Sequence, residues 1–181
     1  MNEAKKKFTI CLIGSIPKGD SERKSWIDWK EKYKKALGVL GEVDFTDGDV
    51  WRDETRPMEL VGHDAYLVQS SDLVVVNAES KLGAGTAQEM VIAKYYERPL
   101  IAVLPKDTHH RRSNVEFDGT KIDDWMHPFL VVVSDLIVEK LDEAIPWIRE
   151  LREDSSAKQI KDIKIIDQAI QKFKEFDNQR G

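Results

Sequence analysis

One short run of the chain, residues 82–89, combines glycines, a hydroxyl and a carboxylate in the order Leu-Gly-Ala-Gly-Thr-Ala-Gln-Glu. It follows an apolar segment, so we expect it to turn from a buried strand into a helix. Gly83 and Gly85 leave room for a substrate over the turn, and Thr86 offers a hydroxyl. Glu89, in the first helical turn, would stay ionised in the field of the helix dipole. A positioned carboxylate of this kind is a nucleophile suited to an anomeric carbon.

The same residues allow a purely structural interpretation. Thr86 and Glu89 have the spacing of a capping box, in which the two side chains satisfy backbone N–H groups at the start of a helix. The local sequence supports both interpretations equally.

A second glycine-containing segment, residues 14–19, reads Gly-Ser-Ile-Pro-Lys-Gly. Gly14 permits close approach of a ligand to the backbone, Ser15 can donate a hydrogen bond, and Lys18 adds a positive charge. These properties suit a phosphate or a sugar hydroxyl. The segment lacks the glycine-lysine-serine/threonine ending of a Walker loop, and a plain strand-to-helix turn explains it about as well.

Other titratable residues give weaker signals. Asp64 lies inside an expected helix, where aspartate is not favoured, so it is either a solvated surface residue or a second functional acid. His63, His109 and His110 match no metal-binding spacing, so we expect no metal site and no cofactor. The single cysteine, Cys11, excludes an internal disulfide and a cysteine-based zinc site.

Strands and helices alternate along the chain. We expect strands at residues 8–13, 42–45, 73–76, 99–104 and 129–133, and helices at 20–37, 58–70 and 86–97. This alternation predicts an α/β fold of the flavodoxin-like or Rossmann-like, doubly wound kind, with a five-stranded, mainly parallel sheet. Ligands of such sheets bind beyond the carboxyl ends of the strands, which is where both glycine-containing segments fall.

The remaining segments give less. Residues 105–128 are polar without a clear period and are expected to form a long loop.

We place an α/β domain at residues 1–150 and a C-terminal helical extension at 151–181. The extension carries an apolar stripe that either packs on its own domain or covers a partner subunit; its residues are Ile160, Ile163, Ile166, Ile170, Phe173 and Phe176. A stripe in the first helix is expected to pack in the core; its residues are Trp26, Trp29, Tyr33 and Leu37.

The composition of the chain limits the classes of protein to which it can belong. The chain has 181 residues, of which 41% are hydrophobic and 34% charged, as in a globular domain with a substantial core. Its net charge of −5 argues against a nucleic-acid partner. Its apolar runs are too short for a membrane span or a secretory signal, so we expect a cytoplasmic protein with no membrane partner.

The landmarks and their order resemble one known family. They are the first strand with its glycine (Ile10 to Ser15), the stretch from Ser71 to Val76, the run from Gly85 to Glu89, and the proline-opened strand from Arg98 to Ile101. Over residues 8–148 the chain resembles the nucleoside 2-deoxyribosyltransferase superfamily, which includes the 2′-deoxynucleoside 5′-monophosphate N-glycosidases. The Gly-Thr-Ala-x-Glu run between two strands is the most specific part.

This resemblance implies roles for individual residues. Glu89 falls on the family's catalytic glutamate, which attacks C1′ of the deoxyribose and displaces the base. Asp64 falls on the helix carboxylate that handles the base or the proton of the leaving group. Gly14, Ser15 and Lys18 match the first loop, which holds the phosphate in the monophosphate hydrolases.

The resemblance also implies partners. The substrate would be a small-molecule nucleoside or nucleotide, and the protein a homodimer or higher homo-oligomer. Ser113 and Asn114 lie about where a neighbouring subunit lends a residue to the site.

The sequence departs from the family pattern in two places. Cys11 stands where the family often has a tyrosine that orients the glutamate, and Gly83 and Ala84 stand where the transferases have an acidic residue. The leading hypothesis is cleavage of an N-glycosidic bond, with transfer of the deoxyribose to water or to another base. A non-catalytic nucleotide-binding or sensing module is the alternative. A third, weaker hypothesis is a phosphoribohydrolase of the family misnamed lysine decarboxylases, although its richer glycine run and arginine motif are not found.

Overall fold

A parallel five-stranded sheet forms the centre of the molecule. The structure is a computed structural model, and it describes residues 7–49 and 53–179. The strand order across the sheet is β2 (Val43–Thr46), β1 (Phe8–Gly14), β3 (Leu73–Asn77), β4 (Leu100–Val103) and β7 (Leu136–Val138). Every neighbouring pair is parallel, and the order is that of flavodoxin-like sheets. The predicted α/β class and five-stranded parallel sheet are confirmed.

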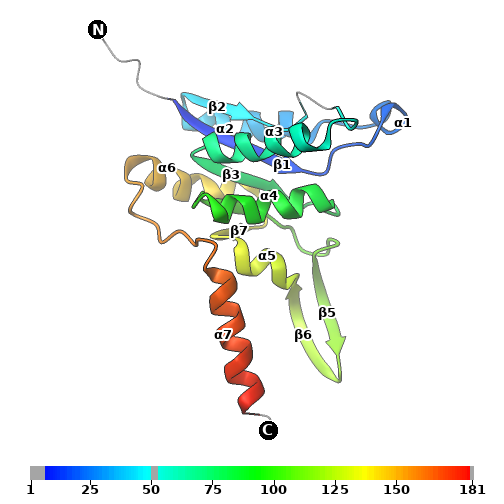
Figure 1. Cartoon of the computed structure of the whole chain (residues 1–181), viewed down its shortest axis with the longest axis vertical. Coiled ribbons are helices and arrows are strands. Elements are labelled where there is room, and N and C mark those ends of the chain that lie inside the picture. Colours follow the sequence, from blue (N-terminus) through cyan, green and yellow to red (C-terminus); the bar gives the residue numbers. More distant parts are fainter. Residues whose placement is uncertain (1–6, 50–52, 180–181) are drawn as a thin grey trace.

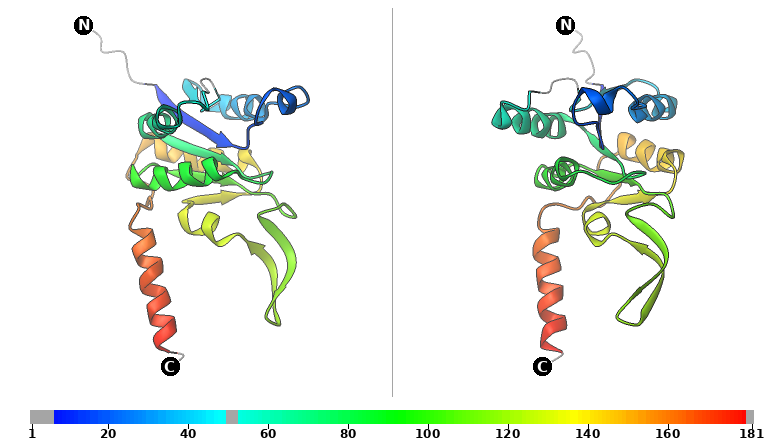
Figure 2. Two further views of the ribbon diagram at one scale, coloured as in Figure 1. Left: turned by 45° about the vertical axis from the view of Figure 1, so that its right-hand side comes forward. Right: turned by 90° about the vertical axis from the view of Figure 1, so that its right-hand side faces the viewer.

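Helices cover both faces of this sheet (Figures 1 and 2). One face packs against α2 (Trp29–Leu37) and α6 (Ile145–Glu153), with the core residues Ile10, Leu12 and Val75 beneath them. The other face packs against α3 (Pro57–Ser70), α4 (Ala84–Tyr95) and α5 (Pro128–Val133), over Ile13, Val74 and Val76. Because successive side chains of a strand point to opposite faces, strands covered on both sides are apolar throughout, as β3 is.

The first predicted helix is wrong in its extent. Residues 20–37 form two helices, α1 (Asp20–Arg23) and α2, separated by residues 24–28. The side chain of Asp28 accepts a hydrogen bond from the Lys30 N–H (2.9 Å), so it caps α2 and starts a new helix there. Tyr33 and Leu37 are buried as expected, whereas Trp26 lies outside α2.

The fifth predicted strand is also wrong. Residues 129–133 belong to α5, and the fifth strand of the sheet is β7, three residues further along. A short apolar run has no period that separates a strand from a helix. Pro128 at the first position of α5 favours the helix, and the buried residues Leu130 and Val133 have helical spacing.

The expected long loop at residues 105–128 contains an antiparallel hairpin, formed by β5 (Arg111–Phe117) and β6 (Thr120–Met126). Phe117 pairs with Thr120 across a two-residue turn. Both turn residues, Asp118 and Gly119, have positive φ angles (48° and 77°). Asp-Gly is a strong local signal for such a turn. We did not predict the hairpin because its strands are polar and have no clear period.

The C-terminal helix, α7 (Ile165–Asn178), points away from the body of the molecule, at the same end as the hairpin (Figures 1 and 2). The predicted stripe is therefore divided between two environments. Ile160 packs against the core and Ile163 precedes the helix, whereas the later members lie on α7. Two short 3-10 helices, η1 (Gly38–Leu40) and η2 (Leu141–Ala144), complete the described elements. None of the helices in the described part of the chain has the length and apolar character needed to cross a bilayer.

Candidate functional site

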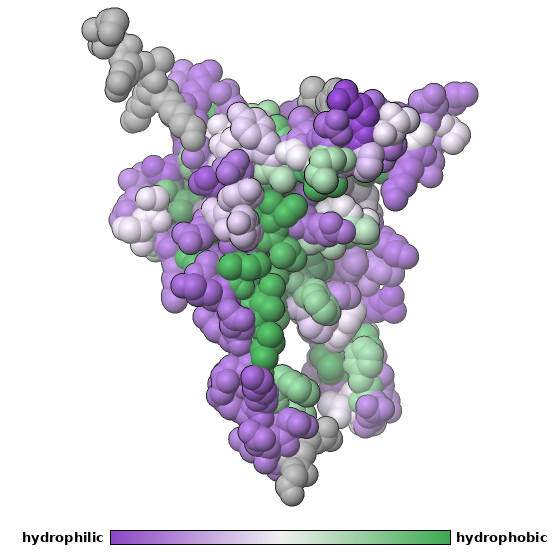
Figure 3. Space-filling model, viewed as in Figure 1, coloured by the Kyte–Doolittle hydropathy of each residue, from purple (hydrophilic) through white to green (hydrophobic). Residues whose placement is uncertain are grey.

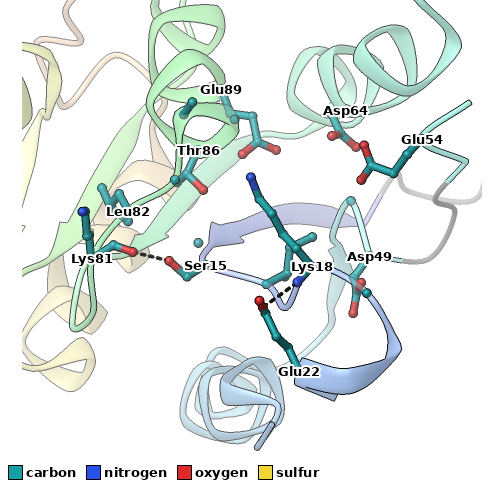
Figure 4. A pocket seen from close by; sticks show the side chains of 17 residues that line it. Ser15, Lys18, Glu22, Asp49, Glu54, Asp64, Lys81, Leu82, Thr86 and Glu89 are labelled. Carbon is teal, nitrogen blue, oxygen red and sulfur yellow. Dashed lines mark hydrogen bonds between the residues drawn. The ribbon is translucent and has the colours of Figure 1, made fainter. Parts of the chain in front are cut away.

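A pocket of about 740 Å³ opens at the carboxyl ends of β1 and β3. Gly14, the last residue of β1, pairs with Asn77, the last residue of β3. In the observed strand order, β2 and β3 flank β1 on opposite sides, so the chain reverses its winding direction here. This is the position at which open α/β sheets bind their ligands. The pocket lies on the side of the sheet that α3 and α4 cover (Figure 4).

The loop from β3 to α4 forms one wall of the pocket, and hydrogen bonds from other parts of the chain hold it. The Tyr33 hydroxyl donates to Oε1 of Glu79 (2.9 Å), and the Ser15 hydroxyl donates to the carbonyl of Lys81. The Leu82 N–H donates to Nε2 of His110 (3.0 Å). The loop therefore reaches the start of α4 in one defined conformation.

The loop after β1 forms the opposite wall of the pocket, and Trp29 supports this loop. The indole N–H of Trp29 donates to the carbonyl of Ser15 (2.9 Å). A Cβ atom at Gly14 would lie only 2.7 Å from Cζ2 of Trp29, so a larger residue would push the indole away. Lys18 projects from this loop into the pocket, and its backbone N–H donates to Glu22 (2.8 Å) (Figure 4).

Glu89 lies in the second turn of α4 and not in the first turn, where we expected it. The helix begins at Ala84 with Gly83 as its N-cap, and no side chain makes a capping hydrogen bond there. The capping-box interpretation of Thr86 and Glu89 is therefore wrong. Glu89 instead lines the pocket and points into it (Figure 4).

Asp64 reaches the same pocket from α3 (Figure 4). Its side chain is about one-fifth exposed (21%), and His63 Nδ1 lies 3.1 Å from its Oδ1. A Cβ atom on Gly48 would come within 2.5 Å of the same oxygen. The glycine after β2 thus makes the space that the Asp64 carboxylate occupies, and Asp64 is not a solvated surface residue.

Cys11 lies on β1, on the side of the sheet that faces the pocket. Burial, followed by the negative charges of Glu89, Asp47 and Asp64, raises the pKa of this thiol to about 12. The thiol is therefore neutral at physiological pH, and a neutral buried thiol is not a nucleophile. Among the acidic residues around it, Glu89 has the largest effect.

Among the described residues that line the pocket, carboxylates outnumber cations. The charged residues are Glu22, Asp49, Glu54, Asp64 and Glu89 against Lys18 and Lys81. One of these carboxylates is neutralised by nearby cations. Arg23 Nη1 and Lys30 Nζ each lie 3.2 Å from Oδ2 of Asp49, and Arg23, followed by Lys30, holds the pKa of Asp49 below its ordinary value.

The pocket collects eight of the residues that we expected at the site: Gly14, Ser15, Lys18, Asp64, Gly83, Gly85, Thr86 and Glu89. Ser113 and Asn114 do not line it. Both are exposed on β5, where the Ser113 hydroxyl donates to Asp107 (2.7 Å). If they serve a site, it is that of a second subunit.

Sequence reasoning missed the contribution of the segment after β2. Gly48 and Asp49 line the pocket, and so does Glu54. The strand-end rule that located the other two loops applies equally to this polar segment, because β2 is parallel to β1. Within the described residues, no group of three or more His, Cys, Asp or Glu side chains is placed to hold a metal ion.

No family model matches the sequence, and no curated protein matches it. Solved structures do resemble the fold. The 2-deoxyribosyltransferase of the psychrotolerant bacterium Bacillus psychrosaccharolyticus superposes with a TM-score of 0.53 and 12% sequence identity, over 85% of this chain and 98% of that one. The CMP N-glycosidase of Clostridium botulinum gives a TM-score of 0.43 and 16% identity, over 77% of this chain and 97% of that one. The chain therefore shares the α/β fold of a 2-deoxyribosyltransferase, to which the sequence resemblance had pointed.

Proposed function

We propose that this protein cleaves the N-glycosidic bond of 2′-deoxynucleosides or their 5′-monophosphates and transfers the deoxyribose to water or to another base. One observation carries the proposal. Two carboxylates from different helices, Glu89 and Asp64, line one pocket at the ligand-binding edge of this fold. The fold shared with a 2-deoxyribosyltransferase supports the same reaction class.

In the proposed first step, a carboxylate oxygen of Glu89 bonds to C1′ while the bond from C1′ to the base nitrogen breaks. The sugar gains oxocarbenium character in the transition state, and a pocket rich in carboxylates stabilises this positive charge. The bonding electrons leave with the base, which needs a proton. Water or a second base then attacks C1′ and restores the Glu89 carboxylate.

Asp64 is the proposed proton donor to the leaving base. Its carboxyl group is four-fifths covered and lines the same pocket as Glu89, so it can face a base bound there. In hydrolysis, the attacking water returns a proton to Asp64, so both carboxyl groups end as they began. We expect Asp64→Asn to slow cleavage by about 10²–10⁴-fold, the usual value of general acid-base catalysis. The loss should be larger for poor leaving groups.

The charge balance bears on which form of the substrate binds. Among the described residues that line the pocket, a phosphate would find Lys18 and Lys81 as cations, beside several carboxylates. Lys18 and the first loop are the groups that would hold a phosphate if one binds. Cleavage rates of deoxynucleosides and of their monophosphates, measured side by side, distinguish the two forms.

The decisive experiment measures free base released from four deoxynucleosides and four deoxynucleoside monophosphates, each with and without an acceptor base. Glu89→Ala should abolish release, and its melting temperature should stay close to that of the wild type because Glu89 does not cap α4. Trapping of a sugar on Glu89, seen as a mass increase of the intact protein, would support the covalent step directly.

A different result favours the alternative function. Binding of nucleosides or nucleotides without release of base, in the wild type and in Glu89→Ala alike, indicates a sensing module. An active but destabilised Glu89→Ala protein would reject the nucleophile assignment.

A further inference from the structure

The last helix of the chain has an apolar face that stays largely open to solvent. Helix α7 contains no buried residue. Four large side chains on it stay about half exposed: Ile166 (42%), Ile170 (48%), Phe173 (63%) and Phe176 (54%). Figure 3 shows apolar atoms of this helix open to view, and an open gap between the helix and the hairpin. A helix of 14 residues is marginally stable alone in water, so this one needs a packing partner.

The direction of α7 is set by a buried anchor just before it. Lys94 and Asp135 form an ion pair whose side chains are at most 1% exposed. The Lys94 ammonium also donates to the carbonyl of Lys161 (3.2 Å), and the Lys161 N–H donates to Asp135 Oδ1 (2.8 Å). The Lys161 ammonium in turn donates to the carbonyl of Ser134 (2.6 Å), just after α5. The chain is therefore held on the body four residues before α7 begins, and the helix is presented outward.

Three of the four exposed residues fit a heptad pattern, and Ile170 lies at the fifth position beside them. Ile166 and Phe173 occupy the first position of two successive heptads, and Ala169 and Phe176 occupy the fourth. These are the positions that meet when two helices pair side by side. The stripe is thus suited to another helix of the same kind.

The charged residues beside the apolar stripe favour pairing with a second copy of this helix that runs in the same direction. Lys172 occupies the seventh position of the first heptad, and Asp177 occupies the fifth position of the second. When two such helices run in the same direction, the seventh position of one lies beside the fifth position of the next heptad on the other. Lys172 of each copy then meets Asp177 of its partner. In opposite directions, seventh positions face each other and two lysines are juxtaposed near the centre.

We propose that α7 is a dimerisation arm, which pairs with α7 of a second copy of this chain in the same direction. The bases of the two arms then lie together, so the two α/β domains sit at the same end of the pair. The proposal does not depend on the reaction that the pocket catalyses.

Light scattering over a concentration series tests the pairing. The wild type should give twice the chain mass of 20.8 kDa at high micromolar concentration. Phe173→Glu should return it to the mass of one chain, with the melting temperature of the domain retained. Gln171→Glu introduces the same side chain on the exposed opposite face and should leave the dimer intact. A wild type with the mass of one chain, or a Phe173→Glu protein that stays dimeric, overturns the proposal.

Charge exchange and cross-linking test the direction. Lys172→Glu and Asp177→Lys should each raise the dissociation constant by about threefold to tenfold, and the double variant should restore it. Ile166→Cys should form an intermolecular disulfide on mild oxidation, since the natural cysteine, Cys11, is buried (1% exposed). Cross-linking of Ile166→Cys chains only to Phe176→Cys chains in a mixture would show the opposite direction and refute the parallel pairing.

Discussion

His110 accepts a hydrogen bond from the backbone N–H of Leu82 through Nε2, at 3.0 Å. This contact joins the base of the hairpin to the loop that leads into α4 and Glu89. Because Nε2 accepts, the ring proton must be on Nδ1, which is buried without a hydrogen-bond partner among the described residues. His110 is thus a neutral imidazole in one tautomer, and we expect it to position the loop.

Removing this acceptor should disturb the pocket. His110→Leu leaves the Leu82 N–H without its partner, which should cost about 0.5–1.5 kcal/mol because this donor is only partly buried. We expect a lower kcat with a smaller change in KM, because the loop orients the start of the Glu89 helix. His110→Gln places an amide oxygen near the former Nε2 and should recover much of the rate. If both variants lose activity equally, the imidazole contributes packing and not a hydrogen bond.

The same residue predicts a pH dependence of stability. Burial, followed by the positive charges of His109, His127, Lys81 and Arg112, lowers the pKa of His110 from 6.5 to about 4. Between these values the unfolded chain binds a proton that the folded chain does not. The contribution of neutral His110 to the free energy of unfolding is therefore fully present above pH 6.5 and is lost as the pH falls toward 4. Urea unfolding of the wild type should show a steeper decline over that interval than unfolding of His110→Gln.

Gly48 should be sensitive to a single added methyl group. In Gly48→Ala, the new Cβ would meet Asp64 Oδ1 at 2.5 Å and displace that carboxyl group. If Asp64 protonates the leaving base, kcat should fall at least tenfold, with the fold retained. Gly62→Ala is the matched control, because its Cβ meets nothing within 4 Å and it lies inside α3. It should keep full activity and gain up to about 1 kcal/mol of stability.

A mixing experiment tests whether Ser113 and Asn114 serve the site of another subunit. Glu89→Ala chains lack the proposed nucleophile, and Ser113→Ala/Asn114→Ala chains would lack the lent residues. If the site is shared, each preparation should be inactive or weak alone. Subunit exchange should then restore up to about a quarter of the activity, because one of the two sites in each mixed dimer is intact and half of the dimers are mixed. A double-alanine protein with full activity would remove both residues from the site.

The buried pair at the base of α7 should matter greatly for folding. Burial lowers the pKa of Lys94, and Asp135 opposes this effect. Lys94→Met would leave the Asp135 carboxylate buried, with the N–H groups of Leu100 and Lys161 as its remaining donors. We expect a loss of about 3–5 kcal/mol in the free energy of unfolding. Lys158→Met breaks a surface pair with Glu150 and should cost about 1 kcal/mol or less.

The sequence alone determined the parts of the molecule that depend on local pattern. Apolar strands such as β3, separated by amphipathic helices, are sufficient to predict a parallel sheet, because a strand covered on both faces must be apolar on both faces. The two glycine-containing loops at strand ends were likewise found from the chain, since parallel strands bring their carboxyl ends to one edge. These two rules place Ser15 and Glu89 at the same edge of the sheet, where both line the pocket.

Only the tertiary structure decided what local pattern leaves ambiguous. Residues 129–133 are compatible with strand or helix, and packing of Leu130 and Val133 against the sheet selected the helix. The local sequence supported a capping role and a pocket-lining role for Glu89 equally. The capping role is excluded because α4 begins at Ala84, which places Glu89 in the second turn. The space for Asp64 depends on Gly48, which is 16 residues away in sequence but touches it in the fold. Contacts of this kind arise from three-dimensional packing, which no spacing along the chain encodes.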